Sequence, residues 1–218
     1  DFRGSTFSGV ADFEGSTFSG DSYFGFSTFS GDAYFRDSTF NGDVYFGFST
    51  FNRNTSFIDS QFSGDTSFNN ASIDKNVLYV GEESVFSGTL DLNRSNIENI
   101  ETYIRWNNIG HLAFNIRIYN IFFDNYKKWR LFEDYSNCYY TFRTELLSRE
   151  PMGLKKILDY FQWILNGFGM KPIFPIIWSI GIILIAGAIF YITNGIQRSN
   201  EKNTPNIVYI PGYQIPRK

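Results

Sequence analysis

Phenylalanine recurs through the first seventy residues at intervals that alternate strictly between five and six residues. The series comprises Phe2, Phe7, Phe13, Phe18, Phe24, Phe29, Phe35, Phe40, Phe46, Phe51, Phe57, Phe62 and Phe68. A small residue stands two positions before each later member: Ser5, Ala11, Ser16, Ser22, Ser27, Ala33, Ser38, Val44, Ser49, Thr55, Ser60 and Thr66. Helices repeat apolar positions about every 3.6 residues and strands every second residue, so neither element generates this spacing. We therefore expect a coil in which a large and a small side chain of each unit point inward.

If four such units close one turn of 22 residues, the series folds into four columns. The columns are Phe2/Phe24/Phe46/Phe68, Phe7/Phe29/Phe51/Ile73, Phe13/Phe35/Phe57 and Phe18/Phe40/Phe62. Paired strands lie about 4.8 Å apart, so each column places like residues above one another. The core of this region is then a rod of stacked rings.

Head-to-tail units of this small-x-large-x-x kind resemble the pentapeptide-repeat family from Asp1 to about Lys75. The resemblance implies a right-handed quadrilateral β-helix over residues 1–75. Every second unit departs from the family pattern by one additional residue, as between Phe7 and Phe13. We interpret that residue as a wider corner at which glycine supplies backbone freedom for a tight turn. The glycines concerned are Gly9, Gly20, Gly31, Gly42 and Gly64.

The repeat rhythm loosens after Ile73, and we expect residues 76–110 to form a cap or transition that covers the last open edge of the coil. Apolar residues then recur at helical spacing through residues 111–170, which predicts an amphipathic α-helical neck. Pro151 interrupts this pattern because proline has no backbone donor. The third amphipathic stretch of the neck runs from Leu154 to Phe168.

Residues 172–197 carry no charge and are long enough to cross a bilayer core, which needs about 20 helical residues. Trp178 and Tyr191 stand near the two ends, where amphipathic rings favour the interface. This pattern predicts one transmembrane helix, with a buried apolar hairpin as the alternative, and a flexible tail at 198–218. Since no export signal precedes the repeats, we expect a single-pass protein of the cell membrane with a cytoplasmic repeat domain, and export by a signal lost upstream is the alternative. Asp1 opens within a repeat unit, which favours a fragment with coils missing upstream.

The chain contains one cysteine, Cys138, and one histidine, His111, which excludes an internal disulfide and leaves too few ligands for a zinc site. Its acidic pairs are scattered along the sequence rather than gathered in one predicted cleft. We therefore expect no catalytic residues, no metal site and no cofactor, and a protein that is not an enzyme. The Gly-Phe-Gly triplet at 167–169 matches no phosphate-binding spacing and is interpreted as a joint.

A candidate interaction surface comes from the outward positions of the coil. Asp21, Asp43 and Asp65 share the 22-residue spacing and are expected to stack at one corner, with Asp32 at the matching corner opposite. Such a ladder presents a negative stripe or holds a cation, whereas Gly-Asp is also good turn chemistry with its carboxylate in water. Tyr23, Tyr34 and Tyr45 lie on neighbouring outward positions, and exposed tyrosines beside acids favour a protein-binding face.

A second resemblance spans residues 100 to 198. The stretch Asp134-Tyr-Ser-Asn-Cys-Tyr-Tyr-Thr-Phe-Arg143, then Leu158-Asp-Tyr, Gly167-Phe-Gly-Met-Lys-Pro172 and the apolar run, is similar to the linker of archaeal pentapeptide-repeat membrane proteins. In those proteins a two-helix ion-channel-like module follows, and no second membrane helix or pore loop appears here after Arg198. The resemblance implies that the chain is the front part of such a protein, with the Leu154–Phe168 stretch along the membrane surface.

Two functions follow. The first is a membrane-anchored scaffold that contacts lipid through residues 172–197 and an unidentified protein through its repeats, without nucleic acid and with oligomerisation left open. The second is DNA mimicry, because some pentapeptide-repeat proteins resemble duplex DNA in width and charge and bind topoisomerases. Residues 1–75 hold ten acidic and four basic residues, a net charge of −6, which permits the second function.

Overall fold

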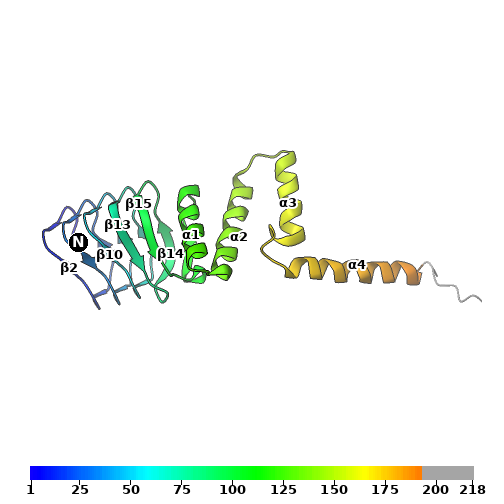
Figure 1. The fold of residues 1–218 in the computed structure, drawn as a ribbon, viewed down its shortest axis with the longest axis horizontal. Helices are drawn as coiled ribbons and strands as arrows, with labels where there is room; N and C mark the ends of the chain where they lie inside the picture. Colours follow the sequence, from blue (N-terminus) through cyan, green and yellow to red (C-terminus); the bar gives the residue numbers. More distant parts are fainter. Residues whose placement is uncertain (193–218) are drawn as a thin grey trace, which may run out of the picture. The chain divides into compact units, whose positions relative to one another are not determined.

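The computed structural model describes residues 1–192, with side chains for all of these except 74–77 and 97–102. The chain divides into two units, of which the first spans Asp1–Pro172 and the second begins at Ile173. The first unit holds a β-solenoid followed by three helices (Figure 1). The described part of the second unit is a single helix.

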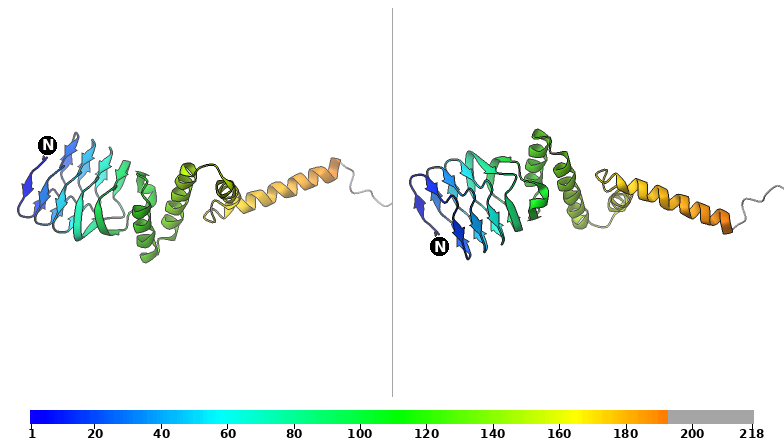
Figure 2. Two further views of the ribbon diagram at one scale, coloured as in Figure 1. Left: turned by 90° about the horizontal axis from the view of Figure 1, so that it is seen from above. Right: turned by 90° about the horizontal axis from the view of Figure 1, so that it is seen from below.

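Strands of two residues alternate with turns through most of the solenoid. They are β1 (Thr6–Phe7), β2 (Ala11–Asp12), β3 (Thr17–Phe18), β4 (Ser22–Tyr23), β5 (Thr28–Phe29), β6 (Ala33–Tyr34), β7 (Thr39–Phe40), β8 (Val44–Tyr45), β9 (Thr50–Phe51), β10 (Thr55–Ser56), β11 (Gln61–Phe62) and β12 (Thr66–Ser67). Four longer strands complete it: β13 (Ser72–Val80), β14 (Val85–Asp91), β15 (Asn96–Thr102) and β16 (Ile109–Leu112). Figure 2 shows the strands of successive coils lying side by side.

All strand pairs of the solenoid are parallel and join each coil to the next. Phe7 pairs with Phe29, and Phe29 with Phe51, in the ladder β1-β5-β9-β13. Three further ladders run through β2-β6-β10-β13, β3-β7-β11-β14 and β4-β8-β12-β14. From β1 to β12 the register of these ladders is 22 residues, which confirms the predicted four-walled coil.

The phenylalanine rings fill the interior as predicted. Within a column, the ring centroids of Phe24 and Phe46 lie 4.9 Å apart and those of Phe29 and Phe51 4.7 Å apart, with nearly parallel planes. Rings of two columns also meet edge to face, as Phe24 does with Phe35 at 5.6 Å and 82°. Both stacked and edge-to-face geometries are favourable for aromatic pairs. The core is therefore continuous along the solenoid as well as across it.

Buried serines at the small positions tie each coil to the one before it. The hydroxyl of Ser49 donates to the carbonyl oxygen of Phe24 at 2.6 Å, and that of Ser27 donates to the carbonyl oxygen of Phe2 at 2.7 Å. Because an unpaired buried hydroxyl or carbonyl is costly, serine suits a position that must be small and must also supply a donor.

The glycines of the wider corners do not act as we interpreted them from the sequence. None of Gly9, Gly20, Gly31, Gly42 and Gly64 has a positive φ. A side chain on Gly42 would instead place its Cβ 2.5 Å from Oδ1 and 2.6 Å from the backbone nitrogen of Asp21. At Gly31, Gly42 and Gly64 the preceding coil approaches too closely for a side chain, whereas nothing lies within 4 Å of a Cβ added to Gly9 or Gly20. The positive φ values lie at the tighter corners instead, beginning with Gly4 (φ 67°) and Gly15 (φ 66°).

On two walls of the last coil, aliphatic residues occupy both the small positions and the ring positions. In the register of the ladders, Leu78 follows Thr55 and Leu90 follows Thr66. Two residues further along the chain, Val80 and Leu92 succeed Phe57 and Phe68 of the preceding coil. Parallel pairing continues through residues 76–110, since β15 pairs with β13 and β16 with β14.

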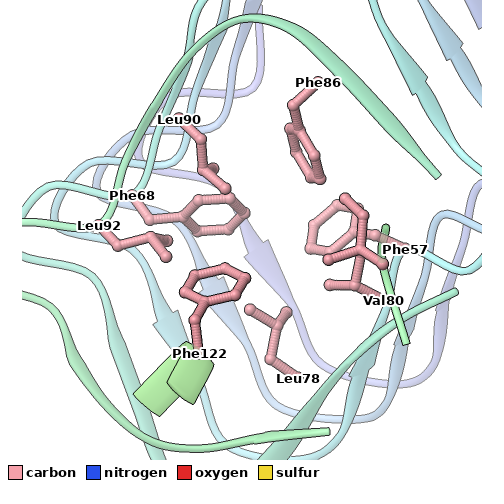
Figure 3. A pocket seen from close by; sticks show the side chains of 9 residues that line it. Phe57, Phe68, Leu78, Val80, Phe86, Leu90, Leu92 and Phe122 are labelled. Carbon is pink, nitrogen blue, oxygen red and sulfur yellow. The ribbon is translucent and has the colours of Figure 1, made fainter. Parts of the chain in front are cut away.

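Helix α1 (Ile116–Lys128) covers the end of the solenoid (Figure 1). Asn115 caps its N-terminus by accepting hydrogen bonds from the backbone N–H groups of Arg117 and Ile118. The ring of Phe122 faces the last coil across an apolar cavity of about 20 Å³ (Figure 3). The cavity is lined by Phe57, Phe68, Leu78, Val80, Phe86, Leu90, Leu92, Ile104 and Phe122. A cavity lined only by hydrocarbon stays dry.

Helix α2 (Phe132–Arg149) packs on α1 and is fixed to the solenoid by Asp134. The buried Asp134 carboxylate accepts a hydrogen bond from the backbone N–H of Trp106 at 2.7 Å through Oδ1. Its Oδ2 lies 3.3 Å from Nε of Arg105. This arrangement balances a buried negative charge with a cation and a backbone donor, as burial of a carboxylate requires.

Helix α3 (Leu154–Asn166) follows and ends at the Gly-Phe-Gly triplet, whose three residues all have positive φ. Phe168 is buried there, with the guanidinium carbon of Arg143 lying 4.7 Å from its ring centroid.

Helix α4 (Ile173–Ile192) is the described part of the second unit, and none of its residues is buried. Its 20 residues have a mean hydropathy of 2.5 and are long enough to cross a membrane. Residues 193–197 of the predicted span and the predicted tail at 198–218 lie outside the described residues.

Candidate interaction surface

The structure brings three of the predicted aspartates together at one corner of the solenoid. Oδ1 of Asp21 accepts a hydrogen bond from the backbone N–H of Asp43 at 3.0 Å, and Oδ1 of Asp43 accepts one from Asp65 at 2.8 Å. Oδ1 of Asp65 accepts one from the backbone N–H of Thr89 at 2.6 Å. Each carboxylate therefore joins its own coil to the next. This bond explains why negative charges one coil apart are tolerated in a row.

Two of the predicted tyrosines lie beside this row of aspartates. The rings of Tyr23 and Tyr45 are stacked, with centroids 5.1 Å apart and planes within 4°. The hydroxyl of Tyr23 donates to Oδ2 of Asp21 at 3.2 Å, and that of Tyr45 donates to Oδ2 of Asp43 at 3.1 Å. The hydrogen bond to Asp21 and its negative charge raise the pKa of the Tyr23 phenol. Both phenols are thus held neutral and in fixed orientation.

The remaining two predicted residues lie elsewhere. Tyr34 is on β6, in the ladder that aligns it with Asp12 and Ser56. Its hydroxyl donates to Oδ2 of Asp32 at 3.4 Å, and the Asp32 charge raises the pKa of the Tyr34 phenol. The seven predicted residues therefore form two groups on different walls.

Two phenylalanines outside the repeat series are the residues that the sequence analysis missed. Phe26 and Phe48 are 67% and 54% exposed, and their rings stack at 4.9 Å with parallel planes. Each occupies a tight corner with a φ of 59°. One coil earlier the equivalent position is Gly4, and one coil later it is Asn70, residue types that adopt this conformation readily.

A sequence signal for these two rings existed. The stretch Tyr-Phe-Gly-Phe-Ser-Thr-Phe occurs at 23–29 and again at 45–51, one coil apart, so its members must stack. Within it, the second phenylalanine of each copy departs from the alternating series. We name the set of Asp21, Tyr23, Phe26, Asp43, Tyr45, Phe48 and Asp65 the aromatic-acidic stripe.

Other candidate groups lie apart from this stripe. Cys138 is buried in α2, where burial raises the pKa of its thiol. His111 is exposed on β16. Over the part of the chain that the structure describes, no three His, Cys, Asp or Glu side chains are grouped so as to hold a metal ion.

Comparison with known proteins agrees with the architecture of the repeats. Residues 1–39 match the family model described as pentapeptide repeats (9 copies). No curated protein and no solved structure matches the chain. The matched residues form the first part of the phenylalanine series, and the same 22-residue register continues beyond them in β7 to β12. The solenoid is therefore built from pentapeptide repeats, and the family match itself covers its first 39 residues.

Proposed function

We propose that the protein is a non-enzymatic scaffold, anchored in a membrane by α4, whose solenoid binds a partner protein through the aromatic-acidic stripe. The observation that carries the proposal is the exposed, stacked pair of Phe26 and Phe48.

The conformation of these two residues is costly for the fold. A residue with a Cβ loses about 1–2 kcal/mol in the left-handed region, and Gly4 avoids this loss at the same corner one coil earlier. Stacking of the two exposed rings returns only part of the cost, because an aromatic pair contributes about 0.5–1.5 kcal/mol beyond burial. Strained residues concentrate at functional sites. We infer that Phe26 and Phe48 are retained for contact with another molecule.

The surroundings of the pair suit a protein partner. Tyr23 and Tyr45 stand three positions before Phe26 and Phe48 along the same coils and add two amphipathic rings. Aromatic residues are enriched in the energetically important centres of protein interfaces. The carboxylates of the stripe favour a partner that presents basic side chains around an apolar centre.

We assign no reaction to the protein because its candidate reactive groups are engaged in the fold. The thiol of Cys138 is buried, and the carboxylates of Asp21 and Asp43 are each engaged by a backbone N–H and a phenol. Groups used in this way support a structural and binding role.

A matched pair of double variants tests the stripe. In Phe26→Gly/Phe48→Gly the exposed rings are removed and the corner strain is relieved. The control is Asp37→Gly/Asp59→Gly, which makes the same change at equivalent left-handed positions half a coil away. Full-length protein is captured from detergent-solubilised membranes of the source organism, and the bound proteins are quantified. We expect at least one protein to bind the wild type and the control equally and to bind the phenylalanine variant about 30-fold less, as for loss of an interface centre worth about 2 kcal/mol. Equal capture by both double variants would refute the proposal.

The anchor is tested separately by phase partitioning. We expect the full chain to enter the detergent phase, and a soluble monomer in detergent-free buffer would contradict the anchor.

DNA mimicry and ion conduction remain alternatives to the scaffold. Inhibition of topoisomerase supercoiling at micromolar protein would support the first, and the engagement of the aspartates with tyrosines and backbone groups favours protein binding instead. Single-channel recording on the reconstituted chain tests the second, which follows only from the resemblance to archaeal membrane proteins.

A further inference from the structure

We propose that α3 lies with its apolar face in the interfacial layer of the same membrane that α4 spans. The inference rests on the proposed anchor and adds a second membrane contact, which is parallel to the lipid surface and belongs to the first unit of the chain.

The polar side of α3 is the side that contacts protein. Its Asp159 carboxylate accepts a hydrogen bond from the guanidinium of Arg143 at 3.0 Å, and its Trp163 indole donates to the Tyr140 hydroxyl at 2.8 Å. Lys156 donates to the backbone carbonyl of Glu150 at 2.7 Å. Residues 156, 159 and 163 follow helical spacing and share one face. That face is directed at α2.

The apolar side of α3 points the other way. At 100° per residue, the large apolar side chains cluster about half a turn from the face that holds Asp159 and Trp163. They are Leu154, Ile157, Leu158, Phe161 and Leu165, all between 45% and 75% exposed. In a helix of a water-soluble domain the apolar face is directed at the protein and the polar face at water. Helix α3 has the reverse orientation, which indicates an apolar medium outside the protein.

Chain connectivity identifies that medium as lipid. Residues 167–172 are all that separates the end of α3 from the start of α4, so the two ends lie within about 25 Å even if the connection is fully extended. Since this reach is less than the bilayer core of about 30 Å, a membrane that holds α4 is always near α3. Lys155 at the start of α3 and the amphipathic ring of Tyr160 are residue types found in interfacial helices.

Fluorescence quenching on the full chain tests the inference. Cys138→Ala provides a cysteine-free background, and single cysteines are introduced as Leu158→Cys and Leu165→Cys on the apolar face. Gln162→Cys serves as the matched control on the polar side, and Ile183→Cys reports on α4. Each variant is labelled with an environment-sensitive fluorophore and reconstituted into nanodiscs of phosphatidylcholine and phosphatidylglycerol, with or without nitroxide-labelled lipid. We expect the nitroxide lipid to quench positions 158, 165 and 183 several-fold more than position 162.

The possible results separate this inference from the anchor. Quenching at position 183 with no difference between 162 and the two apolar positions would overturn the inference and leave the anchor intact. Absence of quenching at 183 would remove the anchor, and absence at 158 and 165 as well would remove both. Apolar positions that are shielded from aqueous iodide but not quenched by lipid nitroxide would show that protein covers the face, either a second copy or another partner, and would also overturn the inference.

Discussion

Removing one ring from the interior measures how much the stacked columns contribute to stability. The change is Phe46→Ala. Phe46 is fully buried, and its ring stacks on Phe24 at 4.9 Å and on Phe68 at 4.8 Å. It also meets the rings of Phe35 and Phe57 edge to face, both at 5.5 Å. The side chain is therefore surrounded by aromatic neighbours on several sides.

The expected cost lies at the upper end of the usual range. Replacing a buried phenylalanine with alanine lowers the free energy of unfolding by about 3–5 kcal/mol, and the value depends on how far the neighbouring side chains can collapse into the cavity. Collapse is limited here, because the rings above and below belong to coils whose spacing is fixed by parallel strand pairing. We therefore expect a loss of about 5 kcal/mol. At about 2–4 °C per kcal/mol for a domain of this size, the apparent Tm should fall by about 10–20 °C.

The assay is thermal unfolding of the detergent-solubilised full chain, followed by circular dichroism. Phe48→Ala is the matched control, since it makes the same substitution two residues away on an exposed ring. Its Tm should stay within about 6 °C of the wild type, the largest shift that corresponds to loss of one aromatic pair. An equal effect of the two substitutions, or a Tm for Phe46→Ala that matches the wild type, would refute the account of the core.

Three further results are expected. Gly42→Ala should destabilise the fold by about 1–3 kcal/mol, because the added Cβ overpacks against Asp21. Gly20→Ala should be near neutral, because nothing lies within 4 Å of its added Cβ. Comparison of the Tm values of the two variants checks both expectations. Asp21→Asn should lower the pKa of Tyr23 in an ultraviolet difference titration, because the charge that raises it is removed. Since the folded-state pKa of Tyr23 lies above the unfolded value of about 10, its contribution to stability is complete below that pH and is lost as the pH rises through the folded value. Cys138 should react with a thiol reagent only after unfolding, and reaction in the native state would contradict its burial.

The repeat architecture was predictable because one residue type marks it. The alternation of five and six residues fixed the 22-residue turn, and the turn fixed which rings stack, as the pairing of Phe7 with Phe29 confirms. No competing signal, such as a helix propensity or a helix cap, occurs within this pattern. Helix α4 was predictable for a similar reason, because an uncharged apolar run of this length is typical of a membrane-spanning helix.

The corners and the end of the solenoid were less predictable. Glycine permits both positive φ and close approach, and the sequence alone does not show which property Gly42 uses. In the last coil the period lengthens, since Phe62 pairs with Phe86 after 24 residues. Leucine also replaces threonine at the small positions, so the pattern that defines the repeat is lost although the pairing continues. To predict that α1 covers the end of the solenoid, its apolar face would have to be matched with the last coil. That coil no longer carries the repeat pattern.

The candidate surface was predicted only in part. Tyr23 and Tyr45 were identified as outward residues of the repeat, and the structure adds their stacking and their bonds to the aspartates. Phe26 and Phe48 were not predicted, because the repeat pattern assigns phenylalanine to the interior and does not show that these two residues have a left-handed backbone conformation. The function of the surface stays a prediction.

The bonds between coils have a consequence for the length of such proteins. The Ser49 hydroxyl donates to the carbonyl of Phe24 one coil earlier, and the Asp43 amide donates to the carboxylate of Asp21 one coil earlier. The Asp65 amide repeats the second bond with Asp43 in the next coil. If a segment of one full period is duplicated or deleted, the coils on the two sides of the junction therefore still present matching hydrogen-bond donors and acceptors. Tandem copying of residues 20–41 should lengthen the rod by about 4.8 Å per copy and add one tyrosine and one phenylalanine to the aromatic-acidic stripe, so such a protein can change length in whole turns without redesign of the interior.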